Sequence, residues 1–139
     1  MSSQLNVDTI VDKAGSGGTN VKIGNTSTYV GEGGSGTQNT VQGLCKAWAN
    51  TSGGGTVAVD DSFNNASVTD NGAGDQTFAF TNNMNNSNYS CNAMTIENAV
   101  IVIIQILGQS SSNVNPKSHS TSASFDVIGK NYSVHGDLA

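Results

Sequence analysis

Residues 70–75 come nearest in this chain to a metal-binding segment. Asp70, Asn71 and Asp75 carry the carboxylate and amide oxygens that Ca²⁺ prefers as ligands, and two glycines between them allow a sharp bend. A helix–loop–helix calcium loop also needs a bidentate Glu at its twelfth position, where this sequence has Thr81. The Asn-Gly dipeptide inside the segment is a strong signal for a tight β-hairpin turn. We therefore expect a hairpin turn here and no bound metal.

Residue types that serve in catalysis occur elsewhere, but without the context that their chemistry requires. His119 and His135 are the only two histidines, and they are too far apart for the His-x-x-x-His spacing of a metal site. Serine is abundant, yet no Gly-x-Ser-x-Gly motif stands between a strand and a helix, as a nucleophile elbow requires. The glycine-rich segment at 15–18 lacks the lysine of a phosphate-binding loop. We expect no enzymatic activity and no cofactor.

Aromatic residues offer a different chemistry, because their rings can stack on sugars. Tyr89 and Tyr132, together with Trp48 and Tyr29, are the candidates for such a surface. Aromatic side chains at strand positions are more often part of a hydrophobic core. The sequence leaves both interpretations open, with Tyr89 and Tyr132 as the possible glycan contacts.

Composition and charge limit the partners of the protein. The chain has 139 residues, a formal net charge of −5 and only 11% charged residues. Its five basic residues are scattered, so they form no positive patch for nucleic acid or for an anionic membrane surface. The longest apolar run, at 99–107, is too short for membrane insertion, and residues 1–4 show no signal peptide. Cys45 and Cys91 fit free thiols in a reducing cytoplasm, although the sequence leaves a disulfide open.

Residues 43–91 carry the clearest pattern of secondary structure. Val57 and Val59, and later Phe78 and Phe80, alternate with polar residues, and a period of two predicts strands with one buried face. Glycine, asparagine and aspartate separate the strands and favour tight turns. We expect antiparallel strands near 43–50, 55–64, 66–70, 75–82 and 88–95. The expected core residues are Trp48, Val57, Val59, Phe63, Phe78 and Phe80.

The apolar run at 99–107 is hydrophobic at both odd and even positions. Such a strand is covered on both faces, and its many β-branched residues favour a strand over the alternative of a buried helix. A small sandwich normally exposes one face of each sheet, so the run predicts a central strand or a contact between subunits. The residues expected at that oligomer interface are Val100, Val102, Ile104 and Ile106.

The segments that flank this pattern have weaker signals. We expect a long polar loop at 108–124 that contains Pro116, a strand at 124–128, a turn at 129–131 and a final strand at 132–134. Residues 1–30 have short alternating stretches, including one at 28–30, with too little apolar area to fold alone. They are expected to form an arm, and 31–40 a Gly/Ser-rich linker. The arm residues expected to anchor the chain on another protein are Leu5, Val7, Ile10, Val11, Val21 and Ile23.

A series of short motifs in the 43–91 segment follows one order. These motifs are Lys46-Ala47-Trp48, Asp61-Ser62-Phe63-Asn64, Thr69-Asp70-Asn71-Gly72, Gly74-Asp75, Phe78, Phe80 and Asn88-Tyr89. The series resembles a small domain at the C-terminal end of tail-fibre proteins of bacterial viruses, especially those of marine and cyanobacterial hosts. The sequence departs from that pattern at 49–54 and at Asp60, where the family usually has a basic residue. The resemblance implies a trimeric fibre protein.

Together these observations predict an all-β protein, a small antiparallel β-sandwich of jelly-roll-like type at 41–139 with an extended N-terminal arm, assembled as a homotrimer. We expect a structural virion protein of a bacteriophage, made in the host cytoplasm, that is attached like a short tail fibre through its arm. One alternative is a capsid decoration or cement protein that stabilises the head. A second is a carbohydrate-binding module that recognises the host surface. The expected partners are further copies of the chain, other tail, baseplate or capsid proteins, and a host surface glycan.

Overall fold

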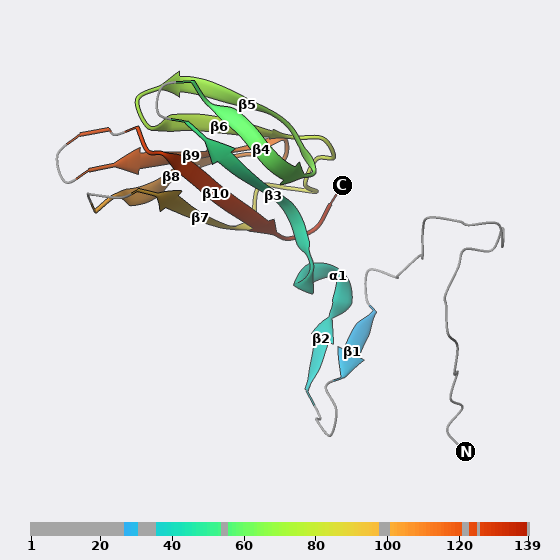
Figure 1. The fold of residues 1–139 in the computed structure, drawn as a ribbon. Helices are drawn as coiled ribbons and strands as arrows, with labels where there is room; N and C mark the ends of the chain where they lie inside the picture. Colours follow the sequence, from blue (N-terminus) through green and yellow to red (C-terminus); the bar gives the residue numbers. More distant parts are fainter. Residues whose placement is uncertain are drawn as a thin grey trace, which may run out of the picture. The chain divides into compact units, whose positions relative to one another are not determined.

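The computed structural model describes residues 27–30, 36–53, 56–97, 101–120, 123–124 and 126–138. The chain divides into two units, Met1–Val41 and Gln42–Ala139. In the first unit, β1 (Thr28–Val30) pairs antiparallel with β2 (Thr37–Asn39), so the strand predicted at 28–30 is confirmed (Figure 1). The described part of the predicted linker, residues 36–40, contains this second strand and the start of a short helix.

The residues expected to anchor the chain lie outside the described residues. They are Leu5, Val7, Ile10, Val11, Val21 and Ile23. Among the described residues, the only helix is the single turn α1 (Thr40–Gly43), and no helix has the length and apolarity that a bilayer crossing requires.

The described residues of the second unit form eight antiparallel strands in two sheets (Figure 1). One sheet has the order β4-β3-β10-β7, and the other has the order β5-β6-β9-β8. The first sheet contains β3 (Cys45–Ser52), β4 (Ala58–Phe63), β7 (Ser90–Ile96) and β10 (Gly129–His135). The second contains β5 (Asn65–Gly72), β6 (Asp75–Phe80), β8 (Ile103–Gln109) and β9 (Asn113–His119).

The inner faces of the two sheets share one hydrophobic core, so the unit is an all-β sandwich. Three connections, β3–β4, β5–β6 and β8–β9, are hairpins within one sheet. The other four connections, β4–β5, β6–β7, β7–β8 and β9–β10, join strands of different sheets. The antiparallel all-β sandwich is confirmed, and the jelly-roll-like topology stays a prediction.

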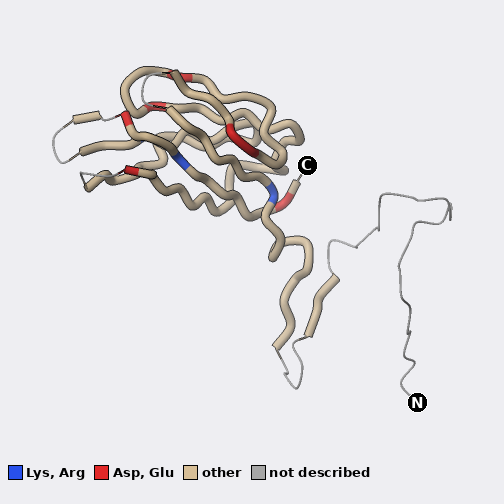
Figure 2. The backbone as a smooth tube through the Cα atoms, in the orientation of Figure 1, with Lys and Arg blue, Asp and Glu red and all other residues tan. Residues whose placement is uncertain are grey.

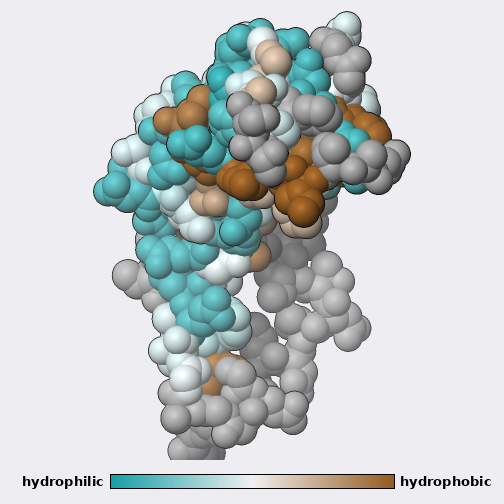
Figure 3. Space-filling view, turned by 90° about the vertical axis from the view of Figure 1, so that its left-hand side faces the viewer, coloured by the Kyte–Doolittle hydropathy of each residue, from teal (hydrophilic) through white to brown (hydrophobic). Residues whose placement is uncertain are grey.

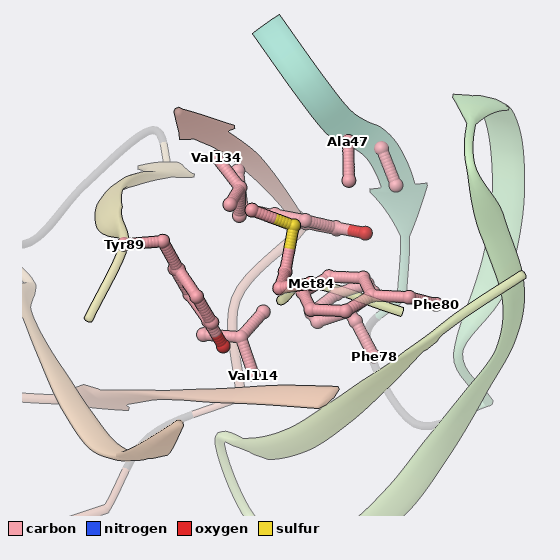
Figure 4. Close-up of a cluster of buried hydrophobic side chains, with 9 residues drawn as sticks. Ala47, Phe78, Phe80, Met84, Tyr89, Val114 and Val134 are labelled. Carbon is pink, nitrogen blue, oxygen red and sulfur yellow. The ribbon is translucent and has the colours of Figure 1, made fainter. Parts of the chain in front are cut away.

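The core contains Phe78 and Phe80 of β6, which were predicted there, at 0% and 6% exposure. Figure 4 shows their rings directed toward Met84, Tyr89 and Val114. This alternation follows from the period of two on β6, where every second residue faces the opposite sheet. The remaining members of the core cluster are Ala47, Ala49, Tyr132 and Val134.

Four of the predicted core residues are not fully buried. Trp48, Val57 and Val59 are half-buried, and Phe63 is 52% exposed, so its assignment to the core was wrong. The register explains the error, because Phe63 lies directly opposite Trp48 on β3, and paired residues share a face of the sheet. On β3, Ala49 and the residues two positions before and after it are the ones whose side chains point inward, toward the other sheet.

The predicted loop at 108–124 contains a whole strand, β9, which lies between β6 and β8. Pro116 misled the prediction, since proline removes a ladder hydrogen bond and is normally excluded from central strands. Here the side-chain amide of Asn115 donates to Gln76 O at 3.1 Å and bridges to β6 beside the proline. Residues 129–131, expected as a turn, begin β10, and the described residues of the strand predicted at 124–128 form no strand beyond one bridge at Ser124.

Candidate functional site

The 70–75 segment contains the predicted hairpin between β5 and β6, but its two turn residues are Ala73 and Gly74, and Asn71 and Gly72, which were expected in the turn, end strand β5. Gly72 and Gly74 have φ angles of 114° and 67°, in the left-handed region that favours glycine. Asp70 Oδ1 accepts a hydrogen bond from the Gly72 N–H at 2.9 Å, and Asn71 Nδ2 donates to Asp75 Oδ1 at 3.0 Å. The polar atoms of the turn therefore bond one another. Among the described residues, no group of three or more His, Cys, Asp or Glu is arranged to hold a metal ion.

Asp75 is the centre of a network on the outer face of the β5-β6-β9-β8 sheet. Its Oδ1 also accepts from Asn115 Nδ2 at 2.8 Å, and its Oδ2 lies 3.4 Å from Lys117 Nζ. Thr77 Oγ1 accepts from the same asparagine at 2.9 Å and from Asn71 at 2.8 Å. Desolvation works to raise the pKa of Asp75, but hydrogen bonds from Asn115, Asn71 and Lys117 outweigh it and hold that pKa below 3.8. These contacts give the network a structural role.

Lys130 lies beneath this turn, inside the sandwich, and is 1% exposed. Its Nζ donates to Gly74 O and, at 3.3 Å, to Pro116 O. Burial lowers the pKa of Lys130 to about 8, although Asp75, Asp126 and Asp70 oppose that shift. The sequence prediction missed Lys130 because it assigned 129–131 to a turn. The alternation along β10 could have indicated its burial, because Lys130 has the same parity as Tyr132 and Val134, which are both buried.

The histidines and cysteines are not brought together as a catalytic group. His119 ends β9 and His135 ends β10, in different sheets, and the His119 Nε2 atom is buried without a partner among the described residues. Cys45 and Cys91 are free and lie on β3 and β7, on opposite sides of β10. Burial raises the pKa of Cys91 to about 11, so its thiol is protonated and weakly nucleophilic at neutral pH.

Tyr89 and Tyr132 are core residues, so their assignment as glycan contacts was wrong. They are only 6% and 3% exposed. The Tyr89 hydroxyl donates to Asn113 O at 2.7 Å, and the Tyr132 hydroxyl donates to Asn65 Oδ1 at 3.1 Å, which satisfies each buried polar group. Burial raises the pKa of Tyr89 to about 12 and also raises the pKa of Tyr132. Neither ring has the exposed face that sugar stacking needs.

Residues 103–107 of the apolar run lie on β8, an edge strand that lies beside β7, the edge strand of the other sheet. Val102, Ile104 and Ile106 were predicted at an oligomer interface, but they are half-buried, and Ile106 packs against the core. Their orientation follows from the register, in which Ile104 and Ile106 pair with inward-facing residues of β9. The fourth predicted residue, Val100, lies outside the described residues.

The most exposed described residues of this run have the opposite parity to the residues that were predicted at the interface. Ile101 and Ile103 are 83% and 60% exposed. Figure 3, which views the sandwich from the end where the β7–β8 and β9–β10 connections lie, shows hydrophobic side chains gathered on this side. We call the set the apolar edge, and its members are Ile96, Ile101, Ile103, Leu107 and Ile128.

The apolar edge is large for a domain of this size. Summed over its five residues, the exposed surface is roughly 500 Å², in the upper part of the range for the largest apolar patch of a monomeric protein. The edge strands β7 and β8 contain no charged residue that would keep another apolar surface away. An exposed surface of this kind is typical of a contact between subunits.

Comparisons with protein-family models, with curated proteins and with solved structures found no match for this chain.

Proposed function

We propose that this chain is a structural protein of a bacteriophage virion, short and tail-fibre-like, which assembles as a homotrimer and is attached through residues 1–30. The observation that carries the proposal is the apolar edge. Covering it in an assembly is worth on the order of 10 kcal/mol per chain, before the costs of association. The free-energy cost of association is of similar size, so a single contact between two chains gives little net stability. An assembly in which each chain makes two such contacts gains more, and it is therefore stable.

The surface chemistry supports the same function. The chain is made soluble by amides and hydroxyls, with only 11% charged residues, a composition suited to an extracellular fibre. The motif residues that carry the tail-fibre resemblance also have defined positions in the sandwich. Asn64, for example, has a φ of 53°, donates through Nδ2 to Lys46 O and to Asn82 O at 3.0 Å each, and accepts from the Asn82 N–H. It thereby joins three segments of the sandwich.

Localisation on purified particles tests the proposal. The full chain and a chain that lacks residues 1–30, each with a C-terminal tag, would be expressed during infection, and gradient-purified particles would be labelled with gold against the tag. We expect label on the tail with the full chain and none with the shortened chain, although both chains form the same oligomer. Label on the head would support the decoration protein instead. Particles free of label with the full chain would contradict a virion role.

A further inference from the structure

The outer face of the β4-β3-β10-β7 sheet combines aromatic rings with amides. Phe63, Trp48 and Ser133 form one row across β4, β3 and β10, because each is directly paired with the next. Asn50 and Asn131 form the adjacent row on the same strands. Directly paired residues point to the same side of a sheet, so all these side chains share one face. We call it the amide–aromatic face, and its members are Trp48, Asn50, Phe63, Asn92, Met94, Asn131 and Ser133.

The polar groups of this face are not used within the protein. Among the described residues, the Trp48 indole N–H and the side-chain amides of Asn92 and Asn131 have no hydrogen-bond partner. Asn50 Oδ1 is covered by neighbouring atoms and also lacks a partner. On the opposite sheet, by contrast, the outward-facing polar residues around Asp75 bond one another closely. Trp48, Asn92 and Asn131 therefore have donors and acceptors that are available to a ligand, whereas the covered Asn50 Oδ1 is not.

The charges around the face favour a neutral ligand. Two carboxylates lie at this face on β4: Asp61, which is paired with Asn50, accepts a hydrogen bond from the backbone N–H of Ser62 at 2.8 Å, and Asp60 accepts one from Ser52 Oγ at 2.9 Å. The two lysines on these strands, Lys46 and Lys130, are 5% and 1% exposed, so no described cation is available to an anionic ligand. Figure 2 shows how sparsely charged residues occur along the sandwich.

We propose that the amide–aromatic face binds a neutral carbohydrate chain. Phe63, 52% exposed, and the half-buried Trp48 supply the apolar surface on which the faces of sugar rings pack. Asn131 and Asn92 supply both donors and acceptors, which matches hydroxyl groups that act in both ways. From β4 to β10 the strands span about 10 Å, so an extended oligosaccharide can lie across the rows. This site goes beyond the proposed virion role and does not depend on it.

Trp48 is the only tryptophan of the chain, so tryptophan fluorescence reports on the environment of this face. The full chain would be run in native gels that contain dextran, galactomannan or xyloglucan as neutral polysaccharides, and in gels with the anionic polysaccharide alginate. Tryptophan emission would be recorded while the retarding polysaccharide is added. We expect at least one neutral polysaccharide to retard the chain and to shift the Trp48 emission, and we expect alginate to do neither.

Matched variants place the binding on this face. Phe63→Ala should weaken binding by at least about tenfold, since an aromatic stacking partner is lost. Leu44→Ala removes a side chain that is similarly exposed, at 55%, away from the face, and should change binding by less than about twofold. Asn131→Ala provides a second variant, and circular dichroism verifies the fold of each.

Three results would overturn the inference. They are no retardation by any of the neutral polysaccharides, equal retardation by alginate, or retardation that neither Phe63→Ala nor Asn131→Ala weakens. None of these measurements depends on virus particles. A failure here is therefore distinct from a failure to find the protein on the virion.

Discussion

Replacing Lys130 with methionine should change how the stability of the sandwich depends on pH. Lys130 is fully enclosed, its amine donates to Gly74 O and to Pro116 O, and burial lowers its pKa to about 8. In the unfolded chain the same amine has a pKa near 10.5. Methionine has a similar shape and no titrating group, so the variant keeps most of the packing and loses the proton equilibrium.

The sign of the effect follows from proton binding. Between pH 8 and pH 10.5 the unfolded chain binds more protons at this lysine than the folded chain does, so the contribution of Lys130 to stability increases with pH. From pH 7 to pH 10 the gain is roughly 2 kcal/mol. Cys91, Tyr89 and Tyr132 act in the opposite direction, because their pKa values are raised in the folded state and their stabilisation is lost above about pH 9. They are unchanged in the variant, so the comparison isolates the lysine.

The assay is urea unfolding followed by Trp48 fluorescence, at one protein concentration and at pH 7, 8.5 and 10. The free energy of unfolding of the original chain minus that of Lys130→Met should increase by roughly 2 kcal/mol across this range. A difference that stays constant, or that decreases toward pH 10, would refute the reasoning about the buried amine.

Three further predictions concern residues with defined contacts. Gly129→Ala should lower the free energy of unfolding by about 3 kcal/mol, because a Cβ at this position would lie 2.5 Å from Thr51 O. Gly108→Ala is the control and should be nearly neutral, because a Cβ there would have no atom within 4 Å. Equal melting temperatures for the two variants would contradict this prediction. Asn64→Ala should lower the free energy of unfolding by about 2 kcal/mol, because it removes the hydrogen bonds of the side chain and places alanine at a positive φ. Asn64→Gly should be less destabilising, because glycine accepts the positive φ but still lacks the hydrogen bonds. Urea titration of both variants measures the difference. Calcium at millimolar concentration should leave the melting temperature unchanged, because the oxygens of Asp70 and Asp75 already accept hydrogen bonds. A rise of several degrees would show instead that this turn binds calcium.

The sequence predicted the strands whose apolar residues alternate and whose ends carry turn residues. Asn71-Gly72 predicted the β5–β6 hairpin, although the turn residues are Ala73 and Gly74, and the burial of Phe78 and Phe80 followed from their period of two. Strand β9 could not be predicted in this way, because Pro116 and its polar neighbours resemble a loop. Its place in the sheet depends on contacts such as that between Asn115 and Gln76, which are distant in sequence.

The candidate surfaces were harder to predict than the strands. The run at 99–107 is apolar at both parities, so the sequence indicates an exposed apolar face without saying which residues form it. The pairing of Ile104 and Ile106 with β9 decides that odd-numbered residues are exposed. The burial of Tyr132 similarly depends on Asn65, which is 67 residues away and accepts the bond from its hydroxyl. Trp48 and Phe63 share an outer face because of a register that alternation alone does not determine.

The mass of the full chain in solution tests the central claim most directly. We predict by sedimentation equilibrium a species of three times the 14.2 kDa chain mass, and a single chain for Ile103→Lys, which places a charge in the apolar edge. Leu44→Lys, at a residue of comparable exposure outside that edge, should keep the mass of the original chain. A mass of 14.2 kDa for the original chain at micromolar concentration would contradict the assembly on which the proposed function rests.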